Sequence, residues 1–283
     1  MGKICVLVDH SAQFPNHSFP GQNLVRVIPF DVELNGIFYP EGKEVKVANL
    51  PLSARNSLNP RLIPPSPDRY AQWFQALSRE FNEILVLTQS SHLSGSFQNA
   101  LLASQTLASG LTVLVVNSQT TSTGLGILAQ IAAENIERGG SLVDVEHLVR
   151  KQVSHIYTVI CTPGLSYLYH AGIVDQAQSI VGELLNFIPV YTIEEERLTP
   201  LEKVRNYRST IELFAEFLEE FEDLRHIALL QSIPPLIQES RSLRQIFQEL
   251  YPNTTYSEHN LNLPTALVFG PRLVGLIAVE NTI

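Results

Sequence analysis

Cysteine is scarce in this sequence, and no cysteine motif is present. The two cysteines, Cys5 and Cys161, each lie in an apolar run, ICVLV and YTVICT. Two isolated cysteines exclude a disulfide framework, a CxxC redox motif and a cysteine-based zinc site. We expect both side chains in the core, because a free cysteine in apolar surroundings behaves as a small hydrophobic residue.

Positive charge is also scarce. Charged residues make up 17% of the 283 residues, apolar residues make up 45%, and the formal net charge is -9. No cluster of basic residues is longer than the pair Arg150-Lys151. Nucleic acids and anionic membranes attract proteins through Lys and Arg. We therefore expect no nucleic-acid partner.

Long apolar runs are missing as well. A helix that spans a bilayer needs about 20 predominantly apolar residues in a row, and the first apolar run of this chain already ends at Asp9. That run is too short for a signal peptide. The sequence predicts a cytoplasmic protein without integral membrane association.

Common catalytic motifs are missing too. The sequence has no GxGxxG, P-loop, GxSxG or HExxH pattern. Most of its histidines are scattered without metal-ligand spacing, and the acidic run from Glu194 to Glu196 is typical of a solvated surface. We expect no cofactor, no metal and no enzymatic activity.

Strand-like and helix-like patterns alternate through the first half. Apolar runs at residues 4–8, 84–87, 113–116 and 157–161 are separated by stretches with apolar residues three and four apart. This alternation predicts an α/β fold with a mostly parallel sheet covered on both faces. We assign residues 1–161 to this Rossmann-like N-terminal domain. Within it, the proline-rich stretch 14–66 is expected to form short antiparallel strands and an irregular excursion.

The second half mixes the two patterns. We expect a smaller α+β domain over residues 162–283, with helices near 175–186 and 209–221. Its expected strands lie near 188–193, 226–231, 254–260 and 266–280.

The stretch from Thr88 to Ala100 (TQSSHLSGSFQNA) carries the most functional information. It is rich in hydroxyl side chains and lies between a predicted strand and a predicted helix. In open α/β sheets, ligands bind at the carboxyl ends of strands, where helix N-termini favour anions. The loop is therefore a candidate anion site. The alternative is that Ser94 or Ser96 only caps the helix.

The segment SSHLSGSFQNA resembles the SS-x-LSGT-[YF]-x-x-A signature of the DegV family, which are bacterial lipid-binding proteins. Other segments are similar to that family in the same order, including KICVLVDHS, VLVVNSQTTSTGL, LSYL and the Gly270-Pro271 pair. The resemblance implies two domains with a fatty acid in a slot between them. For some members it also implies transfer of the fatty acid to a fatty-acid kinase.

The resemblance implies head-group residues at several positions. Ser91 matches the main carboxylate donor of the family, and Ser94 is a secondary candidate in the same loop. Arg205 matches a family arginine in Lys203-Val204-Arg205, with a surface salt bridge to the acidic run as the alternative. Ser118 and His10 are candidate substitutes for donors that this chain has lost.

The lost donors are replaced by apolar residues. The family's Thr-Ser pair corresponds to Leu62 and Ile63, its Gly-Gly-Arg arginine to Ile173, and its distal histidine to Val268. A missing hydrogen bond to a charged group costs about 1.5 to 3 kcal/mol. A head-group pocket with these residues would favour a neutral or differently oriented ligand.

Three functions follow from these patterns. The first is a lipid-binding protein that holds a long-chain fatty acid or similar acyl ligand between two domains. The second is a small-molecule hydrolase or phosphotransferase that uses Asp9, His10 and Ser91 at the strand ends. The third is a family member whose slot is filled by its own Leu62 and Ile63.

Overall fold

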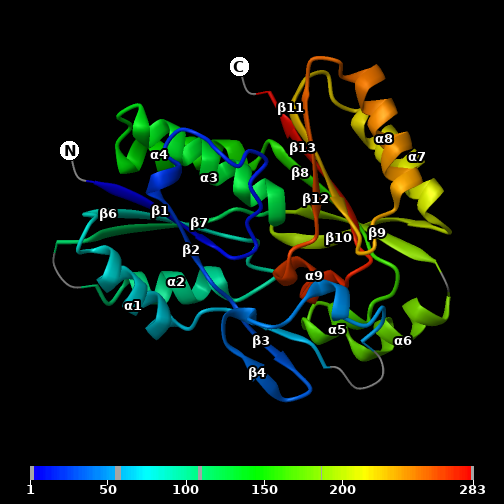
Figure 1. Cartoon of the computed structure of the whole chain (residues 1–283), viewed down its shortest axis with the longest axis horizontal. Helices are drawn as coiled ribbons and strands as arrows, with labels where there is room; N and C mark the ends of the chain where they lie inside the picture. The colour runs from blue at the N-terminus through cyan, green and yellow to red at the C-terminus, as the bar shows by residue number, and fades with distance from the viewer. Residues whose placement is uncertain (1–2, 55–58, 108–109, 186, 282–283) are drawn as a thin grey trace.

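The computed structural model describes residues 3–54, 59–107, 110–185 and 187–281 of the chain. Two large sheets lie side by side (Figure 1). The first half of the chain, blue to green, builds one sheet, and the second half, green to red, builds the other. The α/β fold predicted from the sequence is confirmed.

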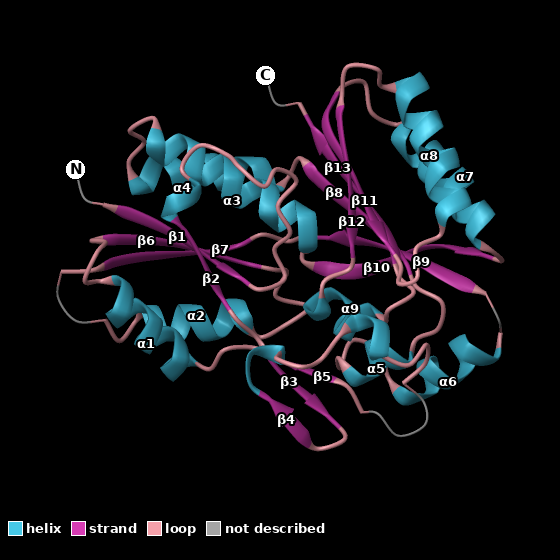
Figure 2. Cartoon of the chain, in the orientation of Figure 1, coloured by secondary structure: helices cyan, strands magenta, loops and turns pink. Residues whose placement is uncertain are grey.

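The first sheet consists of four parallel strands, and its two central strands are buried on both faces. Its order is β2 (Val25–Ile28), β1 (Ile4–Asp9), β6 (Glu83–Thr88), β7 (Thr112–Asn117). Two helices lie on each face (Figure 2), namely α1 (Pro67–Leu77) with α2 (Ser96–Ser104), and α3 (Ser122–Glu137) with α4 (Leu142–Val153). Successive side chains of a strand point to opposite faces, so Leu7 packs with α1 while Val8 packs with α3. Burial on both faces explains why these strands appear in the sequence as unbroken apolar runs.

The second sheet is mixed. Its order is β10 (Arg197–Val204), β9 (Ile188–Glu194), β8 (Ile156–Cys161), β13 (Val274–Glu280), β11 (Leu224–Gln231), β12 (Thr255–Asn260). Only the β11–β12 pair is parallel. Helices α7 (Tyr207–Leu218) and α8 (Ile237–Leu250) cover its outer face with Phe214 and Phe247. The inner face turns toward the first sheet.

Smaller elements fill the lower edge of the molecule in Figure 1. A three-stranded antiparallel sheet has the order β4 (Ile37–Tyr39), β3 (Asp31–Leu34), β5 (Arg61–Ile63). The short 3-10 helix η2 (Pro40–Gly42) contacts β3, and η3 (Val47–Asn49) follows it in the chain, whereas η1 (Gln22–Leu24) contacts α3 and β1. Beside it lie α5 (Ser166–His170), α6 (Gln176–Leu184) and α9 (Leu263–Phe269).

Two sequence predictions about strands were wrong. Residues 157–161 belong to β8, which is antiparallel to both of its neighbours in the second sheet. The fourth parallel strand is β2, from within the stretch 14–66. An apolar run indicates a buried strand but not the sheet that it joins. The predicted boundary after residue 161 would cut the second sheet, so we propose a boundary between α4 and β8.

The start of the predicted strand 266–280 is helical. Residues up to Phe269 belong to α9, and only β13 is extended. Asn262 caps this helix by accepting a hydrogen bond from the Thr265 N–H, and Pro264 lies in its first turn. A short apolar stretch such as TALVF does not distinguish a buried helix from a strand, so the cap and the proline were the informative signals.

Both cysteines are buried with free thiols, as predicted. Burial raises the pKa of Cys5 and of Cys161 to about 12. Since the thiolate is the reactive form, neither group is a nucleophile near neutral pH.

Within the part of the chain that the structure describes, no helix has the length and apolar character needed to cross a membrane.

Candidate functional site

Polar side chains gather where the strands of the first sheet end. Asp9 ends β1, Gln89 and Ser90 follow β6, and Asn117 ends β7. Parallel strands bring their carboxyl ends to one edge of a sheet. All four side chains are nearly or fully buried at this edge.

Asp9 holds two of these loops together. Its Oδ1 accepts hydrogen bonds from the Ser11 N–H at 3.0 Å and the Ser11 hydroxyl at 2.5 Å, and its Oδ2 accepts from the Gln89 N–H at 2.7 Å. Burial raises the pKa of Asp9 to about 6, although these hydrogen bonds oppose the shift. These three hydrogen bonds join the turn after β1 to the loop after β6, which is a structural role.

The loop that contains Ser91 is fixed by its backbone. The Ser91 N–H donates to Asn117 Oδ1 at 3.2 Å, and the Ser90 N–H donates to the Thr120 carbonyl at 2.8 Å. Ser91 is half-buried and lies before the first turn of α2, which begins at Ser96. The loop therefore presents the Ser91 hydroxyl in a defined position.

The Ser91 hydroxyl donates to a carboxylate from the other half of the molecule. The acceptor is Glu196 Oε2, at 2.7 Å, and the Ser90 hydroxyl donates to the Glu196 carbonyl, also at 2.7 Å. Glu196 lies in the turn between β9 and β10, and Figure 2 shows that end of the two strands beside the loops of the first sheet. The interpretation of Glu194 to Glu196 as a solvated surface holds for the exposed Glu194 and Glu195 but is wrong for Glu196, which is partly buried and bonded.

Two other predicted serines form local hydrogen bonds. Ser94 Oγ accepts from the Ser96 N–H at 3.4 Å, which agrees with the alternative that it stabilises the start of the helix. Ser118 is buried, and its hydroxyl exchanges hydrogen bonds with the backbone of Thr120 at 3.3 Å. Neither hydroxyl points to a partner outside its own turn.

His10 lies half-buried after β1, and burial lowers its pKa below the usual value. A group whose pKa is lowered in this way is uncharged at neutral pH. Among the described residues, no hydrogen bond joins Ser91 to His10 or to Asp9. The predicted acid, imidazole and hydroxyl are therefore not assembled as a catalytic triad, which requires hydrogen bonds between successive members.

An apolar cluster joins the two halves of the chain through both sheets and the helices α3 and α4, and it reaches this edge. We call it the shared core, because it contains Val8, Leu87 and Leu93 from the first half together with Ile160, Ile193 and Val268 from the second. Leu62 and Ile173 pack against it. Thus three of the four apolar replacements of family polar residues meet in one cluster. The fourth, Ile63, pairs with Asp31 in the small sheet.

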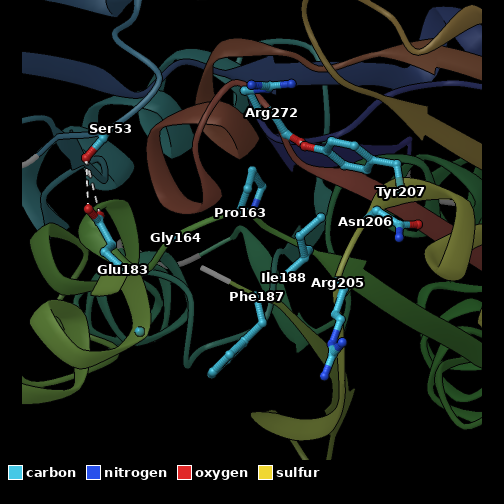
Figure 3. A pocket seen from close by; sticks show the side chains of 11 residues that line it. Ser53, Pro163, Gly164, Glu183, Phe187, Ile188, Arg205, Asn206, Tyr207 and Arg272 are labelled. Atoms are coloured by element: carbon cyan, nitrogen blue, oxygen red, sulfur yellow. Dashed lines mark hydrogen bonds between the residues drawn. The ribbon is translucent and has the colours of Figure 1, made fainter. Parts of the chain in front are cut away.

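Arg205 lies in a different place. It follows β10, whereas Glu196 precedes it, and a strand of 8 residues at about 3.3 Å each separates the two ends by about 25 Å. Arg205 lines a cavity of about 380 Å³ (Figure 3). In this view its guanidinium points away from that of Arg272, and Glu183 on the far side is bonded to Ser53. The salt bridge from Arg205 to the acidic run is also excluded by this separation.

The part of the chain that the structure describes contains no group of three or more His, Cys, Asp or Glu residues placed to hold a metal ion.

Known proteins resemble the chain over nearly its whole length. The model of a family described as "Uncharacterised protein, DegV family" matches residues 3–281. A DegV domain-containing protein of Caldanaerobacter subterraneus is 25% identical over 219 residues, which is 77% of this chain and 78% of that protein.

Solved structures share the fold. A structure described as fatty acid binding of a DegV family protein from Thermus thermophilus is 26% identical, covers 99% of this chain and 100% of its own, and has a TM-score of 0.82. The fatty acid kinase B3 protein of Streptococcus pneumoniae, loaded with linoleic acid, is 15% identical, with a TM-score of 0.81 and coverage of 99% and 100%.

Proposed function

Because the chain belongs to the DegV family, we propose that it binds a long-chain fatty acid or similar acyl lipid between its two sheets and carries it chemically unchanged. The head group lies at the loop of Ser91, and the acyl chain enters the shared core. The relative from Thermus thermophilus, described as fatty-acid-binding, supports this function.

The observation that carries the proposal is the position of the shared core. It is apolar, it is built by both halves of the chain, and Leu93 extends it into the loop of Ser91. A ligand with an apolar tail and one polar end matches this arrangement. Burial of a sixteen-carbon tail is worth on the order of 10 kcal/mol, at about 0.8 kcal/mol per methylene before ordering costs.

The polar groups support carriage more than catalysis. Asp9 is saturated by hydrogen bonds from Ser11 and Gln89, and the Ser91 hydroxyl donates to Glu196. Among the described residues, the group hydrogen-bonded to Ser91 is a carboxylate and not an imidazole, so no Ser–His pair is formed.

Denaturing extraction with organic solvent, followed by mass spectrometry, tests the proposal. Protein purified from cells in native form should release acyl species of roughly 14 to 18 carbons, at close to one per chain. An unrelated protein purified in parallel from the same cells provides the background. An extract at background level would contradict the proposal and would favour the alternative in which Leu62 and its neighbours fill the slot.

A further inference from the structure

Glu196 is the residue of the site that the proposed function does not explain. It brings a carboxylate to the Ser91 hydroxyl, which is the position assigned above to the head group of the lipid. The residues in contact are separated by 105 positions in the chain, so folding of both halves is needed to form this hydrogen bond.

The turn that presents Glu196 is strained. Glu195 and Glu196 occupy the two central positions of a two-residue hairpin, with φ angles of 46° and 72°. Hairpins of this type prefer Asn and Gly at these positions, because other side chains disfavour positive φ. Three adjacent carboxylates, from Glu194 to Glu196, also repel one another. Strained backbone of this kind persists where surrounding contacts impose it, and here Ser90 and Ser91 supply two of them.

The surroundings of Glu196 contain little that would neutralise a second carboxylate. No ion pair among the described residues involves Glu196. Of the residues that stand in place of the family's polar groups, Leu62, Ile173 and Val268 have no side-chain hydrogen-bond donors, and Arg205 lies at the far end of β10. A carboxylate also cannot donate a hydrogen bond to Glu196, because an ionised acid only accepts.

We propose that Glu196 makes the site selective for acyl lipids with an uncharged head group that can donate a hydrogen bond, such as a primary amide or an alcohol. This inference rests on the proposed function and specifies its ligand class. The head group donates to the Glu196 carboxylate and accepts from the Ser91 hydroxyl. A free fatty acid would instead place two carboxylates on one hydroxyl.

Binding of palmitate and palmitamide at pH 8 distinguishes the two classes, because the acid is ionised there and the amide is neutral. The dissociation constants are measured by calorimetry for the delipidated wild-type chain, for Glu196→Gln and for the matched control Glu195→Gln, whose parent side chain is exposed in the same turn. We expect the wild-type chain and the control to bind palmitamide at least tenfold more tightly than palmitate. Glu196→Gln should bind palmitate at least tenfold more tightly than the wild type does, while its affinity for palmitamide changes less than threefold.

The following results would overturn the inference. Palmitate bound more tightly than palmitamide by the wild type, or an unchanged palmitate affinity in Glu196→Gln, would show that Glu196 only joins the two halves. If Glu196→Gln misfolds, Glu195→Asn with Glu196→Gly keeps the turn and removes the carboxylate, and the same comparison applies. A chain that binds neither lipid in any variant would overturn the proposed function together with this inference, whereas equal binding of both lipids overturns the inference alone.

Discussion

The loop of Ser91 and the cavity of Arg205 differ in what surrounds them, although the sequence suggests both as head-group sites. Ser91 lies beside the shared core, and its hydroxyl meets a carboxylate from the opposite half of the chain. Arg205 is exposed at the other end of β10, in a cavity whose two arginines point apart. The Ser91 loop adjoins an apolar cluster built by both halves of the chain, whereas the cavity of Arg205 is lined by Phe187, Ile188 and Tyr207 of the second half.

Whether a polar residue can bind the head group of a lipid depends on the residues around it. A single hydrogen bond contributes about 1 kcal/mol, whereas an acyl tail contributes several times more. A polar residue can orient an acyl lipid only where the tail can also be buried. Arg205 lies at the opposite end of β10 from Glu196 and the Ser91 loop, so it cannot replace the lost donors at that loop, even though its sequence context resembles that of the family.

The largest effect is expected in phosphoryl transfer from a fatty-acid kinase. The family's Thr-Ser pair, arginine and histidine are replaced by Leu62 with Ile63, Ile173 and Val268, and Arg205 is remote. Positioning accounts for most of the catalysis in such transfers. In an assay with a bacterial fatty-acid kinase and ATP, this chain should support acyl-phosphate formation at least a hundredfold more slowly than the fatty acid kinase B3 protein of Streptococcus pneumoniae does.

Equal rates for the two lipid-loaded proteins would contradict this expectation. They would mean that the apolar replacements leave the head group correctly placed, and that Arg205 or another group compensates for the lost donors.

Obstruction of the shared core is expected to have the next largest effect. Ile173→Trp adds bulk at a partly buried position that packs against the shared core. Exclusion of about three methylenes should weaken lipid binding by about 2 to 3 kcal/mol, or about thirtyfold to a hundredfold. Ile246→Trp is the matched control, because Ile246 is also partly buried but packs on the outer face of the second sheet.

Calorimetry with palmitate and palmitamide measures both variants. Equal losses of affinity in Ile173→Trp and Ile246→Trp would place the tail outside the shared core, or would reveal a general effect on folding, which thermal unfolding detects separately.

A smaller loss of lipid affinity is expected when Ser91 is substituted, and a comparison with the substitution of Arg205 distinguishes the two polar sites. Ser91→Ala removes the hydroxyl that orients the head group, so lipid affinity should fall about tenfold, which is about 1.4 kcal/mol. Arg205→Ala should leave affinity unchanged within about twofold. A loss in Arg205→Ala that matches or exceeds the loss in Ser91→Ala would reverse the comparison and assign the head group to the cavity.

The smallest effect is expected in the pH dependence of the free energy of unfolding, to which Asp9 contributes. Its pKa is raised to about 6 in the folded chain, above the value of about 3.9 for an unperturbed Asp. The folded state therefore binds more protons than the unfolded state between about pH 4 and pH 6, so the contribution of Asp9 to stability falls as pH rises through this window. Relative to Asp9→Asn, which does not titrate, the wild type should gain about 1 kcal/mol on acidification from pH 7 to pH 5.

Urea denaturation of both chains at the two pH values measures this gain as a change in the difference between their free energies of unfolding. If the stability of the wild type relative to Asp9→Asn stays constant with pH, or decreases on acidification, burial does not destabilise the Asp9 carboxylate.

Features that depend on local sequence patterns could be predicted from the sequence. The parallel strands β1, β6 and β7, the helices between them and the loop of Ser91 follow from apolar periodicity and from the family motif, whereas β2 does not. Long-range pairing was not accessible in this way. β8 looks like the other buried strands but joins the second sheet, because strand partners depend on contacts far along the chain.

The contact of Glu196 illustrates the same limit within the site. A run of three glutamates is usually solvated, and only the tight turn between β9 and β10 brings one of them to Ser91. The positive φ angles at Glu195 and Glu196 arise from this turn. A short acidic run after the predicted strand 188–193 was the available signal, and its partner could be found only in three dimensions.

Photo-crosslinking of the acyl tail tests the central claim most directly. Palmitate and palmitamide that carry a diazirine near the end of the chain are bound, irradiated and mapped by peptide mass spectrometry. We predict crosslinks to shared-core residues such as Leu93, Ile173 and Val268, and none to the cavity of Arg205. Crosslinks concentrated at the cavity residues Phe187 and Ile188 would contradict the account.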